Sequence, residues 1–201
     1  MNYLAHAYLS FHHPEITVGN LISDFVKGKK KFDYPINIQK GITLHRDIDA
    51  FTDVHAATKE AKKVFQPHYR LYSGAFVDVV YDHFLACDTK EFSGDLLLKF
   101  SNEVYSILEK YLHEFPDGFA NMFPYMKRYN WLLNYRTQAG VEKSFWGIVH
   151  RAAYLAESDT AYRLFKDNYQ LLQDCYRPFW KEIKPYAKDQ FIALANLENN
   201  L

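Results

Sequence analysis

The chain of 201 residues carries no formal net charge and is 48% hydrophobic. This length is typical of one domain with a sizeable core, and the balanced charge excludes a general electrostatic attraction to nucleic acid or membranes. Sixteen Tyr and sixteen Phe against eight Gly and seven Pro indicate aromatic helix–helix packing rather than strands and turns. We therefore expect one all-α domain over residues 1–201, built as a helical bundle.

Neither the cysteines nor the first residues indicate secretion or membrane insertion. Cys87 and Cys175 fit no metal-binding or redox spacing and are expected to be reduced thiols. The stretch MNYLAHAYLSFHH is apolar but lacks a basic region and a cleavage site of small residues. Because no apolar run is long enough to span a bilayer, we expect a cytoplasmic protein without a membrane partner.

Two short helices are expected first, and each carries a polar side chain among apolar ones. Asn2 can cap the first helix, on which His6 is either a core histidine bonded to a neighbour or a metal ligand. Pro14 can begin a second helix over Glu15–Lys27. Asp24 on this helix is expected to be partly buried, so it needs a cation, a metal or backbone donors. It is therefore either a ligand or the acceptor of a helix-to-loop hydrogen bond.

Four lysines crowd into the five positions that begin at Lys27. They are Lys27, Lys29, Lys30 and Lys31. Such a run is commonly no more than a solvated surface. Since it follows Asp24 directly, it also fits a docking patch for an acidic partner or a phosphate, and we take these lysines as candidate partner-binding residues.

The stretch Gly41–His55, GITLHRDIDAFTDVH, organises the prediction of function. As a helix it places His45, Asp49 and Asp53 at i, i+4 and i+8, on one face. A surface helix seldom sets an imidazole and two carboxylates in register among apolar residues. The row indicates one wall of a polar cavity between helices.

A second wall is expected on a long apolar helix over Leu71–Ala86. Asp78 and Asp82 lie one turn apart on it, and His83 adjoins the second carboxylate. Carboxylates on so apolar a helix are costly without a cation between them. The alternative is that they pair with arginines.

The rest of the chain is less informative. Further helices are expected over Ala56–Phe65, Asp95–Phe115, Ala120–Tyr135, Val141–Leu155 and Asp159–Leu194, with breaks near Pro67, Pro124, Pro178 and Pro185. The stretch MKRYNWLLNYR combines basic and aromatic residues, which can bind RNA. Without net positive charge or a nucleic-acid motif, no nucleic-acid partner is expected. His150 and Arg151 are interpreted as structural.

The polar side chains on these apolar helices are all imidazoles or carboxylates. We assign His6, Asp24, His45, Asp82 and His83 to a metal and Asp49, Asp78 and Arg46 to catalysis. This set suits Mn²⁺, Mg²⁺, Fe²⁺ or Zn²⁺ and is typical of metal-assisted hydrolysis. An arginine can stabilise the remaining charge on a phosphoryl group. The spacing matches neither HExxH nor an EF-hand loop.

Four stretches in order, NYLAHAYLS, GNLISDFVKG, GITLHRDIDAFTD and YDHFLA, resemble the signature blocks of the acyl carrier protein phosphodiesterase family. The resemblance covers the first half of the chain and is weak in the second. It implies an all-α fold distantly related to HD-type phosphohydrolases. Asp24, His45 and the pair Asp82-His83 match polar positions of those blocks. The His-Asp dipeptide of the wider superfamily is absent, because Arg46 follows His45.

The resemblance also implies an activity and a partner. The family removes 4′-phosphopantetheine from a serine of holo-acyl carrier protein, with Mn²⁺ as the favoured metal and Mg²⁺ or Fe²⁺ as alternatives. Acyl carrier proteins are strongly acidic, so the lysine run would dock them. Two other hypotheses stay open: an HD-like phosphohydrolase of a small phosphodiester or nucleotide, and a non-catalytic helical binding protein whose polar residues pair with arginines.

Overall fold

The computed structural model describes residues 1–196, which contain eleven α-helices, four 3₁₀ helices and no strand. The all-α prediction is confirmed, while the relation to HD-type phosphohydrolases stays a prediction. Buried hydrophobic side chains from Met1 to Ala187 form one cluster. Within the described range, no helix combines the length and the apolar character needed to cross a bilayer.

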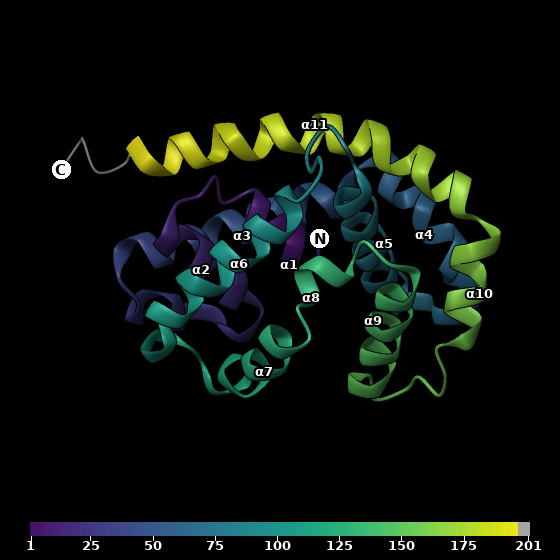
Figure 1. Cartoon of the computed structure of the whole chain (residues 1–201), viewed down its shortest axis with the longest axis horizontal. Coiled ribbons are helices and arrows are strands. Elements are labelled where there is room, and N and C mark those ends of the chain that lie inside the picture. Colours follow the sequence, from purple (N-terminus) through teal and green to yellow (C-terminus); the bar gives the residue numbers. More distant parts are fainter. Residues whose placement is uncertain (197–201) are drawn as a thin grey trace.

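Helices from both halves of the chain enclose the start of the protein. The first are α1 (Tyr3–Tyr8), α2 (Pro14–Ile22), the 3₁₀ helices η1 (Ser23–Phe25) and η2 (Gly28–Asp33), and α3 (Ile36–Val54). Then come α4 (Ala56–Tyr69), η3 (Arg70–Tyr72), α5 (Ser73–Cys87), α6 (Leu96–Lys110), η4 (Leu112–Glu114), α7 (Asp117–Arg128), α8 (Trp131–Asn134), α9 (Gln138–Arg151), α10 (Asp159–Asp167) and α11 (Tyr169–Asn196). In Figure 1, α2, α3 and α6 lie on one side and α4, α5, α9 and α10 on the other, with the N-terminus between them. The long α11 crosses the top and packs on α3, α4 and α5.

Two glycines let α2 and α3 pack unusually close. A Cβ added at Gly19 would lie 2.1 Å from the carbonyl oxygen of Ile38, and one at Gly41 would lie 2.3 Å from that of Ile16. Both distances are far below a van der Waals contact, so only glycine fits here. The backbone of α2 is thereby held against the α3 segment that leads to His45.

The four prolines at which breaks were expected lie inside helices. They are Pro67 in α4, Pro124 in α7, and Pro178 and Pro185 in α11. An internal proline costs about 3 kcal/mol, whereas fully burying one large apolar side chain contributes about 1.5–3 kcal/mol. Buried residues flank each proline, as Phe65 and Tyr69 flank the one in α4. The prediction of breaks is wrong because this burial outweighs the lost hydrogen bond.

The caps predicted at the first two helices are confirmed, but the second helix is shorter than expected. The Asn2 side chain accepts a hydrogen bond from the Tyr3 amide, and Pro14 begins α2. The α-helix ends at Ile22, and the next three residues form η1. Asp24 therefore lies on a tight turn beyond the helix, from which its side chain reaches α3.

Candidate metal centre

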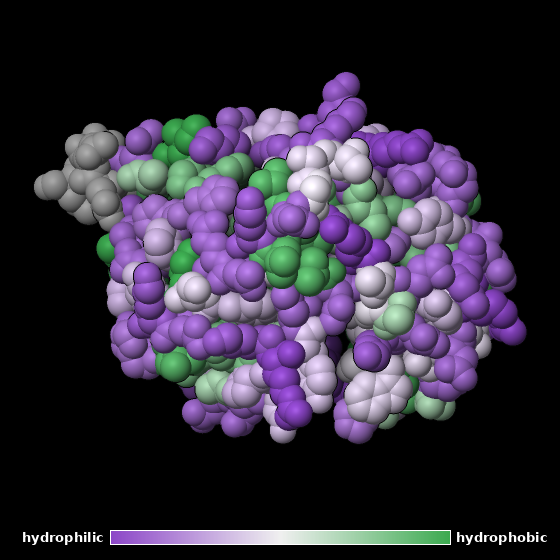
Figure 2. Space-filling view, in the orientation of Figure 1, coloured by the Kyte–Doolittle hydropathy of each residue, from purple (hydrophilic) through white to green (hydrophobic). Residues whose placement is uncertain are grey.

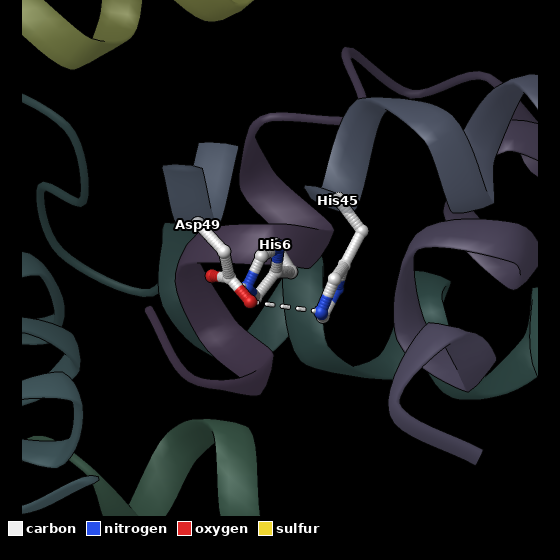
Figure 3. Close-up of side chains that lie close together, drawn as sticks. All are labelled: His6, His45 and Asp49. Atoms are coloured by element: carbon white, nitrogen blue, oxygen red, sulfur yellow. Dashed lines mark ion pairs between the residues drawn. The ribbon is translucent and has the colours of Figure 1, made fainter. Parts of the chain in front are cut away.

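His6, His45 and Asp49 come together in the interior of the first half of the chain (Figure 3). His6 comes from α1, and the other two lie one turn apart on α3. His6 Nε2 lies 3.2 Å from Asp49 Oδ1, and His45 Nε2 lies 3.1 Å from Asp49 Oδ2. One ligand atom from each residue lies within 4.8 Å of the others, a grouping that could hold a metal ion. The two imidazole rings stack with centroids 4.0 Å apart.

The backbone of α2 fixes the orientation of His45. Its Nδ1 lies 2.8 Å from the carbonyl oxygen of Asn20, which can only accept, so Nδ1 carries the proton. Nε2 then faces two carboxylates, Asp49 and Asp24, the latter at 3.2 Å. Burial by itself lowers the pKa of His45, but these two carboxylates raise it to about 9. The geometry therefore requires a positive charge at Nε2, either a proton or a metal.

His6 is one of several buried side chains in the described part of the chain whose polar atoms lack a hydrogen-bond partner. Neither ring nitrogen forms a hydrogen bond with any residue in the described part of the chain. Burial and the neighbouring His45 lower the pKa of His6 to about 4, so the ring is neutral. An unsatisfied buried polar group costs about 1–3 kcal/mol. A cation among the three side chains would satisfy this nitrogen, so the donor set fits a divalent metal.

Asp49 and Asp78 meet at the α-amino nitrogen of Met1. This nitrogen lies 3.2 Å from Asp49 Oδ1 and 3.1 Å from Asp78 Oδ1. Burial acts to raise the pKa of Asp49, but the ammonium group and the two histidines outweigh it and lower that pKa. Burial raises the pKa of Asp78 despite the same ammonium group. Asp49 is thus an ionised carboxylate at the centre, and Asp78 lies behind it.

Asp82 and His83, predicted as ligands, are not brought into this group. Asp82 accepts hydrogen bonds from the backbone amides of Asn2, Leu4 and Ala5 at 2.7–3.3 Å. Burial raises its pKa to about 7, against the effect of these donors. Asp82 therefore holds the start of α1, and through it the position of His6.

His83 is occupied elsewhere because adjacent helical residues diverge by roughly 100°. Its Nδ1 donates to the carbonyl oxygen of Tyr135 at 2.7 Å, and its Nε2 lies 3.0 Å from the Tyr169 hydroxyl. Burial lowers its pKa, as expected for a neutral core histidine. His83 thus connects α5 to the segment after α8 and to α11.

The remaining candidates lie at the surface around the centre. Asp24 is 65% exposed, and the hydrogen bond with His45 lowers its pKa. The Arg46 guanidinium donates to the carbonyl oxygen of Val26 at 3.0 Å. Asp53, the last member of the predicted row, is exposed and pairs with Lys62 at 2.7 Å. The row that was predicted on one face of α3 therefore contributes only its first two residues.

The lysine run lies on and next to η2, directly after Asp24 in the chain. Lys27, Lys29 and Lys30 are exposed, and Lys31 is half-buried beside the ring of Phe32. No ion pair joins these lysines to an acidic residue within residues 1–196. Their charge is thus available at the surface.

Sequence reasoning missed the groups that hold the centre in place. The Asn20 carbonyl and the Met1 amino nitrogen are backbone atoms. Every residue has such atoms, so the residue type does not indicate their role. The glycines of α2 and α3 gave a signal, because two small residues on neighbouring helices permit a close approach. That signal has meaning only once the two helices are known to pack together.

Comparisons with known proteins agree with the resemblance seen in the sequence. Residues 1–183 match the family model described as acyl carrier protein phosphodiesterase. A protein named acyl carrier protein phosphodiesterase from Klebsiella pneumoniae subsp. pneumoniae is 31% identical over 191 residues, which cover 94% of this chain and 99% of that protein. One of the same name from Yersinia pestis is 30% identical over 193 residues, covering 96% and 100%. No solved structure matches.

Proposed function

The chain belongs to the acyl carrier protein phosphodiesterase family, and we propose that it hydrolyses holo-acyl carrier protein to the apo form and 4′-phosphopantetheine. The bond broken is the phosphoester to the carrier serine, with water as the nucleophile. We further propose that a divalent metal, Mn²⁺ first among the candidates, takes part. The observation that carries the metal proposal is the pair of imidazole Nε2 atoms turned toward the ionised carboxylate of Asp49.

The metal would be held by His6, His45 and Asp49. Asp24 would lie next to it, as a further carboxylate on the solvent side. Two imidazoles and carboxylates suit Mn²⁺, Fe²⁺ or Zn²⁺. A divalent cation bound there would lower the pKa of a water molecule and offset charge on the phosphoryl oxygens. Because Asp82 is engaged at the start of α1, it supports His6 in this proposal as a positioning residue.

The chain's own residues would orient the substrate and handle protons. Asp24 lies at the exposed edge of the centre, 3.2 Å from His45 Nε2, where its carboxylate can accept a proton from the attacking water. Arg46 stays a predicted charge-stabilising residue, and it would have to leave the Val26 carbonyl to contact a phosphate. Asp78 stays a predicted catalytic residue that acts through the amino group next to Asp49.

We propose that the lysine run docks the carrier protein. Its unpaired positive charge lies next to Asp24 in the chain, and the apolar side chains of Phe32 and Ile36 are exposed beside it. An acidic carrier surface would find complementary charge and apolar contact there. Docking at this place would bring the carrier serine to the exposed edge of the metal centre.

Mass spectrometry of holo-acyl carrier protein tests the proposed reaction. Incubation with the protein and Mn²⁺ is expected to reduce the carrier mass by the phosphopantetheine arm, and a chelator is expected to stop this loss. An unchanged carrier mass under all tested metals contradicts the proposal. Hydrolysis of a nucleotide phosphodiester with no action on the carrier would favour the small-molecule alternative.

A further inference from the structure

A cavity of about 540 Å³ lies between α8, α9 and the beginning of α1. Aromatic side chains form much of its lining: Tyr3, Tyr125, Tyr129, Trp131 and Trp146. Figure 2 shows a hollow below the centre of the view, bordered by residues near the middle of the hydropathy scale. Trp146 is 60% exposed and Tyr125 is 59% exposed. Large aromatic surface left in water around a cavity indicates a binding site.

Helix α1 contributes Tyr3 to the lining of the cavity and His6 to the metal centre. Asn2 and Tyr3 line the cavity, and His6 follows one turn later on the same helix. Burial and the carboxylate of Asp24 act to raise the pKa of Tyr3, whereas the guanidinium of Arg151 acts to lower it. Tyr3 is thus within electrostatic reach of both the metal centre and the cavity wall. A ligand long enough to occupy both places would extend along α1 past Tyr3.

The lining restricts the charge of the ligand. Lys143 and Arg151 are the cationic members, and no Asp or Glu is among the lining residues in the described chain. Asn134, Ser144 and His150 add groups that donate or accept hydrogen bonds. The cavity therefore suits a ligand that is neutral or anionic, partly apolar and rich in hydrogen-bonding groups.

We propose that this cavity binds the pantetheine arm of the carrier substrate while the phosphodiester lies at the metal centre. This inference rests on the proposed function. The arm carries a dimethyl group, a hydroxyl, two amides and a thiol, and none of these is charged. Its apolar parts fit against Trp131 and Trp146, and its amides have partners in the polar side chains. Its phosphate end would extend out of the cavity toward the metal centre.

Tryptophan fluorescence tests the assignment without relying on turnover. The chain has three Trp, and Trp180 is buried elsewhere, where its Nε1 donates to Glu91. In a Trp180→Phe variant, both remaining tryptophans line the cavity. Titration with pantetheine is expected to change the fluorescence saturably, and 4′-phosphopantetheine is expected to bind about tenfold more tightly, because it adds a charged contact worth about 1.4 kcal/mol.

A second variant fills the cavity. Gly147 lines it, and a Cβ added there meets only the flexible end of Arg151, at 3.5 Å. Placing Gly147→Phe in the Trp180→Phe background is expected to weaken pantetheine binding about tenfold or more, while the matched Gly147→Ala keeps it. Melting curves monitor the fold of both variants.

The outcomes separate this inference from the proposed function. The assignment is overturned if pantetheine and 4′-phosphopantetheine leave the fluorescence unchanged in protein that cleaves holo-carrier. It is also overturned if AMP saturates the cavity and pantetheine does not. If the same protein fails to cleave holo-carrier, the proposed function is contradicted. Saturable pantetheine binding that Gly147→Phe weakens would still show that the cavity binds pantetheine.

Discussion

The two ring nitrogens of His45 have different partners, and this difference defines the candidate centre. Nδ1 donates to a backbone carbonyl of α2, so Nε2 is the atom directed at the carboxylates of Asp24 and Asp49. In metal proteins a histidine ligand is commonly oriented by a hydrogen bond from its other nitrogen. The imidazole of His45 is therefore prepared for a cation before any cation binds.

At this scale, Asp49→Asn is expected to weaken Mn²⁺ binding by about a hundredfold or more, because it removes the charged ligand between two imidazoles. Asp53→Asn is the matched control on the same helix, since Asp53 is exposed and pairs with Lys62. Isothermal titration calorimetry with Mn²⁺ measures both affinities. Equal affinities in the two variants would rule out Asp49 as a ligand.

Asp82→Asn separates a ligand from a helix-holding residue. The carboxylate accepts three backbone hydrogen bonds at the start of α1, so we expect a loss of about 2 kcal/mol in the free energy of unfolding. Mn²⁺ affinity is expected to fall much less than in Asp49→Asn. Urea unfolding measures the free energy of unfolding, and isothermal titration calorimetry measures the Mn²⁺ affinity. A drop in affinity as large as that of Asp49→Asn would indicate that Asp82 is a metal ligand.

Among the helices, the pair α2–α3 positions most of the centre. Helix α2 supplies the Asn20 carbonyl, and α3 supplies His45 and Asp49. The close contact at Gly19 and Gly41 sets the distance between the Asn20 carbonyl and the His45 ring. A wider separation would break that hydrogen bond and free the ring to rotate. The packing of these two helices is therefore a condition for metal binding.

Gly41→Ala is expected to lower the free energy of unfolding by about 3 kcal/mol, since its Cβ would collide with the backbone of Ile16. Gly147→Ala in α9 is the control. Its Cβ has room, and alanine stabilises a helix interior by about 1 kcal/mol relative to glycine. Urea denaturation of both variants measures the difference, and a neutral Gly41→Ala would show that α2 and α3 can separate without cost.

Glu91, in the connection between α5 and α6, joins that connection to α1 and α11. Its carboxylate accepts from the Tyr8 hydroxyl, from Trp180 Nε1 at 2.9 Å and from Lys184 Nζ at 2.6 Å. Burial acts to raise the pKa of Glu91, but these donors lower it. Because the pKa of Glu91 is lower in the folded than in the unfolded state, its carboxylate stabilises the fold above the unfolded pKa of about 4.3. This stabilisation is lost as the pH falls through the folded pKa.

Glu91→Gln is accordingly expected to cost about 2 kcal/mol at pH 7. The cost is expected to shrink as pH falls below the unfolded pKa of about 4.3 and through the lower folded pKa, because the carboxylate then loses its charge. Glu182→Gln on α11 is the control, because Glu182 is exposed and its loss is expected to change stability by less than about 0.5 kcal/mol. Urea unfolding at pH 7 and at acid pH measures both. A cost that is independent of pH would exclude the charge of Glu91 as its cause.

On the scale of the whole molecule, three features lie along one proposed path for the substrate. The lysine run on η2 adjoins Asp24, the metal centre lies between α1 and α3, and the aromatic cavity begins at Tyr3. A carrier protein is larger than any of them, so recognition at the surface and chemistry in the interior are separable. Charge on the surface would govern encounter and affinity, while the centre governs the chemical step.

Charge reversal in the triple variant Lys29→Glu, Lys30→Glu and Lys31→Glu is expected to raise KM for holo-carrier about tenfold and leave hydrolysis of a small phosphodiester intact. High salt should reduce this difference, because it screens exposed charges. The control triple reverses exposed lysines on other helices: Lys59, Lys110 and Lys181. If the first triple slows both substrates equally, the lysines do not act by docking the carrier.

The sequence by itself determined the helical class and the pairing of His45 with Asp49, because helical periodicity is a local property. The family was likewise readable from four ordered stretches.

Only the tertiary structure brought His6 of α1 to α3, turned Asp82 to the start of α1, and directed His83 away to Tyr135. The basic and aromatic composition of MKRYNWLLNYR is compatible with RNA binding, whereas in the structure its Trp131 lines the cavity beside α1. The convergence of side chains from separate helices depends on how closely and at what angle those helices pack, and glycines such as Gly41 set that distance only against a specific neighbour.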